Sequence, residues 1–175
     1  VESVASEQIV PAVSRDMIKY ILLRLYNPKT NRGFLRNFNH VEHIISLIKN
    51  LYEYNRQFFD DIKNKFFTYN SSGKIEHLTK RIYDKNLFDN ILKDEIGKLI
   101  NHLKALIQRA RNDIEENEIK DYAIRLGTAS NLIDDFINLK HNINEYVYWI
   151  ELSSTKVDSN VSLCISPIDI SDYFR

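Results

Sequence analysis

The chain has 175 residues, 43% of them apolar, and its 24 basic side chains are balanced by 24 acidic ones. This length is typical of one domain, and the apolar content is sufficient for a hydrophobic core. A dedicated nucleic-acid-binding domain usually carries an excess of basic residues, so bulk charge gives no support to that class. Any contact with nucleic acid would need a local group of basic side chains.

The sequence also bears on the compartment. The stretch Val1-Glu2-Ser3-Val4 has neither the basic region nor the apolar region of a secretory signal. No segment reaches the roughly 18 consecutive apolar residues of a membrane span. The single cysteine, Cys164, cannot form a disulfide within one chain. These features predict a cytoplasmic protein with no membrane partner.

Apolar residues spaced three or four apart predict helices in the first half of the chain. A first helix is expected from about residue 6 to 25, and it should end at Asn27-Pro28, because a residue before proline disfavours the helical conformation. A second, longer helix is expected from about residue 40 to 67. Asn39 is its predicted N-cap, with Glu42 placed as in a capping box.

The same spacing continues beyond a polar break at residues 70–73. Residues 74–83 are compatible with a strand, a loop or a helical turn. A third helix is expected from about residue 87 to 116 and a fourth from about 119 to 142. Gly97 and Gly127 lie inside these helices, where a close helix–helix crossing would explain them.

The periodicity changes near the end of the chain. Residues 146–151 and 161–170 alternate large apolar residues with polar or small ones, which is typical of half-buried strands. The predicted fold class is therefore mainly α: an elongated antiparallel helical bundle with a short C-terminal pair of β-strands. We expect the two strands to need a sheet that this chain does not supply, which indicates a piece of a larger protein.

The sequence contains no recognisable catalytic motif. His40 and His43 have a spacing that suits a metal, but no further ligand is expected beside them. Adjacent carboxylates such as Asp60-Asp61 and Asp134-Asp135 point about 100° apart on a helix and do not form a paired acid/base site. The glycines are isolated, so there is no phosphate-binding loop. We predict no catalytic residue, no metal site and no cofactor within the chain.

Basic residues near aromatic ones form the candidate nucleic-acid contacts. Phe34 and Phe38 lie among the first group of basic residues, a mixture that single-strand-binding proteins use. The simpler interpretation is a solvated loop and a charged helix face. The candidate contacts are Lys29, Arg32 and Arg36 in the early loop, and Lys104, Arg109 and Arg111 late in the third helix.

The two C-terminal segments carry a family resemblance. Tyr146-Val147-Tyr148-Trp149-Ile150-Glu151 and, after a spacer, Leu163-Cys164-Ile165-Ser166-Pro167-Ile168-Asp169-Ile170-Ser171 resemble the DinG branch of the XPD-like DNA helicases. Members there often read aromatic-Trp-Ile-Glu and then a short strand ending in Pro-Leu-Asp-Val-Ser. Here Ile168 and Ile170 replace the Leu and the Val. The residues Val1-Glu2-Ser3-Val4 are similar to sequence just after the DEAH box of that family.

The resemblance implies that residues 1–145 are the helical arch insertion of the first helicase motor domain. Residues 146–175 would be the strands that return to that motor domain, which is absent from this chain. The parent would be an ATP-dependent DNA helicase of superfamily two, with ATP and Mg²⁺ bound outside this chain; some relatives carry an exonuclease domain. The chain itself would be non-catalytic and would enclose or gate single-stranded DNA. Its implied partners are that DNA, bound weakly in isolation, and the parent's own motor domains.

A stand-alone helical protein–protein interaction module is the alternative. The two hypotheses differ in geometry, because an inserted domain begins and ends at one place. The helicase hypothesis therefore predicts that residues 1–5 lie close to residues 146–170. The interaction module makes no such demand and needs no partner sheet.

Overall fold

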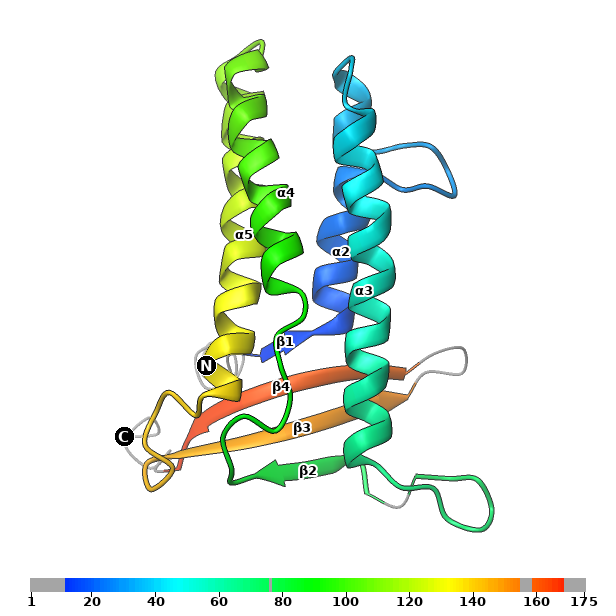
Figure 1. Cartoon of the computed structure of the whole chain (residues 1–175), viewed down its shortest axis with the longest axis vertical. Helices are drawn as coiled ribbons and strands as arrows, with labels where there is room; N and C mark the ends of the chain where they lie inside the picture. The colour runs from blue at the N-terminus through cyan, green and yellow to red at the C-terminus, as the bar shows by residue number, and fades with distance from the viewer. Residues whose placement is uncertain (1–11, 76, 155–158, 169–175) are drawn as a thin grey trace, which may run out of the picture. The chain divides into compact units, whose positions relative to one another are not determined.

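The computed structural model describes residues 12–75, 77–154 and 159–168. Within these ranges the chain forms four α-helices and one antiparallel sheet of four strands (Figure 1). The prediction of a mainly α bundle with only two strands is therefore wrong, and the fold is α/β. The chain divides into two compact units, which are described separately.

The first unit holds the sheet and comprises the described parts of residues 1–15, 59–89 and 132–175. Its strand order is β1-β4-β3-β2. The C-terminal strands β3 (Tyr146–Ser154) and β4 (Ser159–Pro167) pair with each other at the centre, and β1 (Ala12–Ser14) and β2 (Thr79–Ile82) pair with their outer edges. The chain itself therefore supplies the strands that we expected to be missing.

The two outer strands are short, which explains why the sequence did not reveal them. Residues 12–14 fall inside the first predicted helix, but helix α2 (Arg15–Leu25) begins only after them. Three residues are too few to show an alternating pattern. In β2 only Ile82 is buried, so that strand has no apolar periodicity to detect. Both strands form because β3 and β4 offer them backbone partners.

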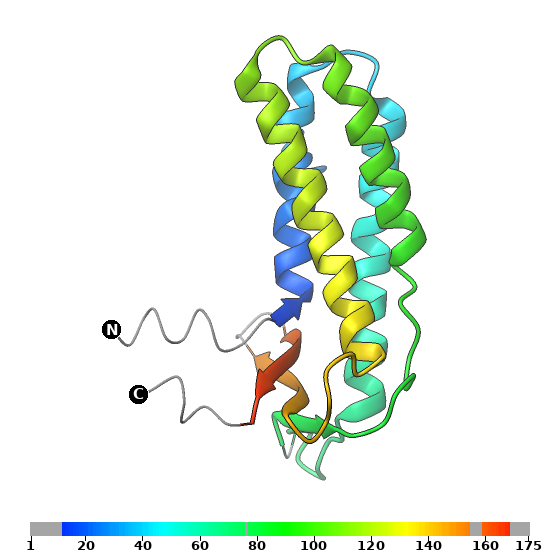
Figure 2. The same cartoon turned by 90° about the vertical axis from the view of Figure 1, so that its left-hand side faces the viewer.

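Aromatic side chains join the sheet to the end of helix α5 (Asp113–Ile137). The ring of Phe136 lies 5.9 Å from that of Tyr148 on β3, and 6.1 Å from that of Phe88. Along β3, Tyr148, Ile150 and Leu152 are at most 2% exposed, which confirms the predicted half-buried strand. The ends of helices α3 and α5 lie on one side of the sheet (Figure 2).

The second unit comprises residues 16–58 and 90–131 and is helical. It contains α2, most of α3 (Glu42–Phe66), α4 (Lys93–Leu106) and the first part of α5, and successive helices run antiparallel (Figures 1 and 2). The apolar faces expected from the spacing form its core. Its fully buried residues include Ile18, Leu22, Ile48, Leu51, Ile96, Leu99, Leu103 and Leu126.

Helix α3 agrees with the prediction for residues 40–67, but its cap does not. The carbonyl of Val41 accepts the hydrogen bond from Ile45 N–H at 3.0 Å, so Val41 occupies the N-cap position. Asn39 lies two residues earlier, and its predicted capping role is wrong. His40, between them, has a positive φ of 55°, which turns the chain before the helix begins.

The boundary between the third and fourth predicted helices is also wrong. Helix α4 ends at Leu106, a short 3-10 helix η2 (Ile107–Arg109) follows, and α5 already begins at Asp113. The side chain of Asn112 accepts a hydrogen bond from Glu115 N–H at 2.9 Å, and the Glu115 carboxylate accepts one from Arg111 N–H at 2.9 Å. This arrangement is close to a capping box, so the acidic residues begin a helix here instead of ending one.

A close crossing does not explain the two helical glycines. A Cβ added at Gly97 would meet no atom within 4 Å, and one at Gly127 would lie 3.7 Å from Ile100 Cδ1, an ordinary contact. The predicted reason for these glycines is therefore wrong. No helix among the described residues is long and apolar enough to cross a membrane.

Candidate functional site

The loop between α2 and α3, residues 26–41, carries three of the six predicted nucleic-acid contacts. Its own hydrogen bonds hold it in shape. Asn27 N–H donates to the Arg32 carbonyl at 2.7 Å, and the Tyr26 hydroxyl donates to Asn31 Oδ1 at 2.8 Å. These two bonds hold the backbone around Arg32 in one conformation.

Gly33 anchors this loop against the end of α2. Its φ is 137°, and a Cβ at this position would lie 2.5 Å from the carbonyl oxygen of Leu25. Only glycine combines this backbone conformation with this close approach. The 3-10 helix η1 (Phe34–Asn37) follows directly, and Phe34 is buried with its ring 5.7 Å from that of Tyr122 on α5. The loop is thus tied to two helices.

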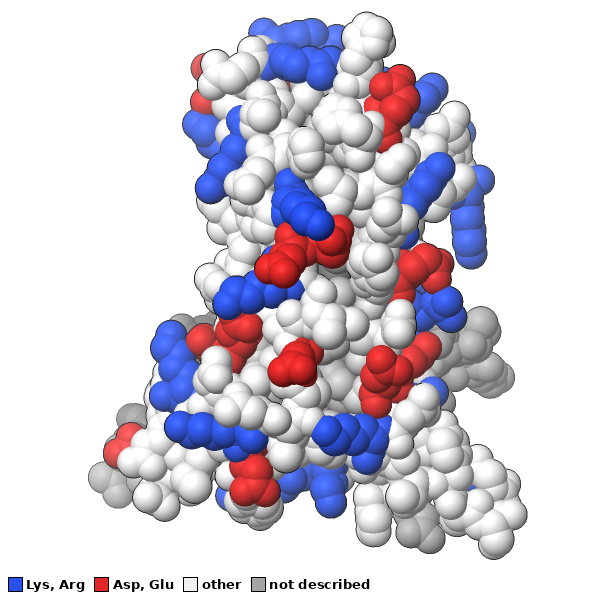
Figure 3. All heavy atoms as spheres, viewed as in Figure 1, with Lys and Arg blue, Asp and Glu red and all other residues white. Residues whose placement is uncertain are grey.

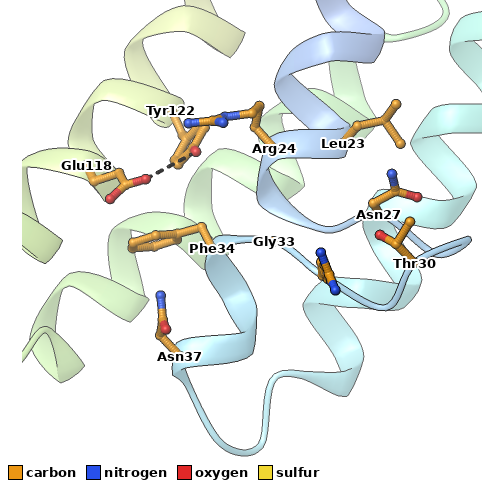
Figure 4. Close-up of a pocket in the computed structure, with 10 residues that line it drawn as sticks. Leu23, Arg24, Asn27, Thr30, Gly33, Phe34, Asn37, Glu118 and Tyr122 are labelled. Carbon is orange, nitrogen blue, oxygen red and sulfur yellow. Dashed lines mark hydrogen bonds between the residues drawn. The ribbon is translucent and has the colours of Figure 1, made fainter.

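A pocket of about 430 Å³ lies beside this loop, and we call it the Arg32 pocket (Figure 4). Arg24, Glu118 and Tyr122 lie together on one side of it, and Asn27 and Thr30 lie on another. The remaining lining residues are Leu23, Arg32, Gly33, Phe34 and Asn37.

The electrostatic balance of the Arg32 pocket is positive. Two guanidinium groups, those of Arg24 and Arg32, line it with one carboxylate, that of Glu118. The Tyr122 hydroxyl donates to Glu118 Oε1 at 3.3 Å. Burial, and then the charge of Glu118, raise the pKa of Tyr122, so this hydroxyl stays protonated at neutral pH.

A second pocket, of about 500 Å³, lies beside the same loop, and we call it the Arg36 pocket. Arg36, His40 and Lys49 line it with one carboxylate, that of Glu42. The ammonium of Lys49 lies 5.9 Å from the ring centroid of Tyr26, at the outer limit for a cation–π contact. Two of the predicted contact residues, Arg32 and Arg36, thus line separate pockets, whereas Lys29 is exposed on the loop and lines neither.

The second group of predicted contacts, Lys104, Arg109 and Arg111, lies in three different environments. Arg109 donates a hydrogen bond to the carbonyl of Asn39, which joins it to the loop. Arg111 instead forms an ion pair with Glu115 at 2.5 Å, which offsets its charge. Lys104 is exposed on α4. Of this group, only Arg109 is tied to the loop by a hydrogen bond.

Several residues of these pockets were not predicted from the sequence. Arg24, Asn37, Lys49, Glu118 and Tyr122 occur in amphipathic or acidic stretches whose local pattern indicates only a helix or a turn. Only the fold brings residues near 24, 32–37 and 118–122 together. No local signal in the sequence could have identified them.

The surface charge is mixed. On the face shown in Figure 3, basic and acidic groups are interspersed over the described residues instead of forming a continuous basic stripe. Contact with a phosphate backbone would therefore depend on local clusters, since each neutralised phosphate needs its own cation.

The structure brings no further metal ligands to His40 and His43 among the described residues. His43 packs edge-on against His102 of α4, with 5.0 Å between ring centroids. Across the part of the chain that the structure describes, no group of three or more His, Cys, Asp or Glu side chains could hold a metal ion.

Comparisons with known proteins do not assign a family. No protein-family model matches the sequence, and no curated protein matches it either. The helicase resemblance therefore continues as a hypothesis that rests on this chain's own residues.

Proposed function

We propose that this chain is the non-catalytic arch portion of a DinG-type, superfamily-two DNA helicase, where it encloses or gates single-stranded DNA beside the motor domains. One observation carries the proposal. β1 pairs antiparallel with β4, with Ala12 opposite Cys164, so an early and a late segment of the chain lie side by side. A domain inserted into another needs this arrangement. Residues 1–5, which we predict to lie close to residues 146–170, are outside the described residues.

The sheet limits how this chain would join the motor domain. Among the described residues, β1 pairs with residues 162–164 of β4 and β2 with residues 148–151 of β3, so only the middle of each central strand has a neighbour on both sides. A sheet of the motor domain could extend this one beside β1 or β2, or beside the parts of β3 and β4 that these short strands leave uncovered.

The loop at residues 26–41 supports contact with a single strand. It carries Lys29, Arg32 and Arg36, all of them exposed, and Arg109 is bonded to it. The acidic neighbours Glu118 and Glu42 keep the local charge moderate. A gate with few phosphate contacts would let the strand slide, because each added contact raises affinity and salt dependence. ATP and Mg²⁺ would act only in the motor domains.

A protein–protein interaction module is the second candidate, and the outer face of α5 favours it. Ile114 and Ile124 are 77% and 66% exposed and lie about 15 Å apart along this helix. A partner helix or sheet edge could cover them. This alternative makes no use of the basic loop.

A titration with a labelled single-stranded oligonucleotide separates the two proposals. The arch proposal predicts binding that is weaker than micromolar at physiological salt, tightens steadily as salt is lowered, and is reduced by Arg32→Gln with Arg36→Gln. The matched control is Ile114→Ser with Ile124→Ser, which should leave DNA binding unchanged. Absence of binding even at low salt would contradict the arch proposal, and so would ATP hydrolysis by the chain alone.

A further inference from the structure

We propose that the Arg32 pocket binds the phosphate group of a ligand about the size of a mononucleotide. The inference concerns the chemistry of this pocket and does not depend on the helicase assignment. It begins with size. A pocket of about 430 Å³ falls within the range of about 300–1,000 Å³ that holds small-molecule ligands. A free phosphate alone would leave most of this space unfilled.

The hydrogen-bonding groups of the pocket favour an anion. Arg24 and Arg32 supply guanidinium groups, and the amide of Asn37 and the hydroxyl of Thr30 can donate as well. The side chains of Arg32, Asn37 and Thr30 have no hydrogen-bond or ion-pair partner among the described residues. A phosphate offers several acceptor oxygens and pairs well with planar guanidinium groups.

Of the described residues that line the pocket, Glu118 alone is acidic, and it already has a hydrogen-bond partner. Glu118 accepts the hydrogen bond of Tyr122, and Tyr122 is 6% exposed. Arg24 lies beside that tyrosine in Figure 4. Arg32, by contrast, faces no carboxylate partner among the described residues. The structure therefore assigns the phosphate to the Arg32 side of the pocket, away from Glu118.

The loop is organised for this role before binding. The Asn27–Arg32 backbone pairing and the close approach of Gly33 to Leu25 fix the chain on both sides of the guanidinium. A rigid loop loses less conformational entropy when it binds than a flexible one.

Isothermal titration at constant ionic strength tests the inference with AMP, inorganic phosphate and adenosine as probes. AMP should bind saturably in the millimolar range or tighter, phosphate more weakly, and adenosine not measurably. Arg32→Gln should weaken AMP binding about tenfold, which is typical of a lost hydrogen bond to a charged group. Lys80→Gln is the control, because it removes the same charge from an exposed residue of β2 that does not line the pocket.

A variant that binds AMP more tightly is also needed, because weaker binding alone could result from unfolding. Glu118→Gln removes the only carboxylate among the described residues that line the pocket, yet keeps an oxygen that can accept from Tyr122. It should strengthen AMP binding several-fold. Asn37→Asp adds a negative charge at nearly constant shape and should abolish binding.

A further titration with an oligonucleotide distinguishes between two sources of the phosphate. A short oligo(dT) without terminal phosphate tests for a phosphodiester, and AMP tests for a free nucleotide. The probe that binds more tightly identifies the source of the phosphate. In either case, Arg32→Gln should weaken the binding of that probe. Equal binding of adenosine and AMP, equal weakening by Lys80→Gln, or no saturable binding of any phosphate probe would overturn the inference.

Discussion

The side chain of Arg109 donates a hydrogen bond to the main-chain carbonyl of Asn39, which lies seventy positions earlier in the sequence. This contact joins the two groups of basic residues that the sequence suggested separately. It also closes the C-terminal side of the loop at residues 26–41, where the chain turns into α3. The basic loop is therefore part of a tertiary structure and not a free surface segment.

Arg109→Gln should loosen this end of the loop. Loss of one hydrogen bond from a charged donor corresponds to a local opening that is about tenfold more frequent. Amide hydrogen exchange of residues 36–41 should accelerate about tenfold, while exchange in α3 and α4 stays unchanged. Lys104→Gln is the control, since Lys104 is an exposed cation of α4 and should have no effect on the loop.

Gly97→Ala should stabilise the protein. The added methyl group meets open space, and alanine is favoured over glycine inside a helix by about 0.5–1 kcal/mol. Gly127→Ala should give a similar gain, with its Cβ in ordinary contact with Ile100. Urea denaturation would measure both. A loss of stability in either variant would mean that these helices approach more closely than the structure shows.

Gly33→Ala provides the opposite result in the same assay. The new Cβ would lie within 2.5–2.8 Å of the backbone of Leu25 and Tyr26, at a φ that alanine rarely adopts. We expect a loss of about 1–3 kcal/mol, typical of a strained backbone position. Binding of AMP should weaken in parallel, because the position of Arg32 depends on this turn. Unchanged stability would contradict the described loop conformation.

Tyr148→Phe should destabilise the sheet unit. The Tyr148 hydroxyl donates to the His141 carbonyl at 3.0 Å and accepts from His141 N–H at 2.7 Å, and the side chain is 1% exposed. Removing the hydroxyl leaves the N–H and the carbonyl of His141 without this partner, which should lower the free energy of unfolding by about 1–3 kcal/mol. Thermal unfolding measures the loss. Tyr146→Phe is a useful control, because Tyr146 is only partly buried and its ring stacks on His141 at 4.5 Å.

Glu115→Gln should change how stability depends on pH. Hydrogen bonds from the Arg111 side chain and then from its backbone lower the pKa of Glu115 below its usual 4.5. A lowered pKa stabilises the folded state above about pH 4.5, and this contribution disappears as the pH falls through the folded-state value. The variant should therefore be less stable than the wild type at pH 7, with a smaller difference at pH 3. Equal differences at both values would contradict the role of the ionised carboxylate.

The sequence predicts the long elements well and the short ones poorly. Helix α3 and strands β3 and β4 have strong periodicities that match their burial, so their existence follows from local pattern. β1 and β2 are defined by pairing with distant strands, which no local pattern reveals. The start of α5 could have been found, because Asn112 and Glu115 stand at the spacing of a capping box.

The candidate site is predictable only in part for the same reason. The sequence singles out Arg32 and Arg36 because basic and aromatic residues are mixed in that loop. It cannot indicate that Glu118 and Tyr122 complete a pocket with Arg32, since these residues meet only after α5 packs beside the loop. Nor does it separate Arg111, which is paired with Glu115, from Arg109, which is bonded to the loop.

We propose that this chain is an insertion in a DEAH-box helicase, and the coding sequence on both sides of it provides the decisive test. The proposal predicts codons for Asp-Glu-Ala-His shortly before Val1 and helicase motifs in the same reading frame beyond Arg175. A start codon directly before Val1 and a stop codon directly after Arg175 would contradict the proposal. The interaction module would then be the function to pursue.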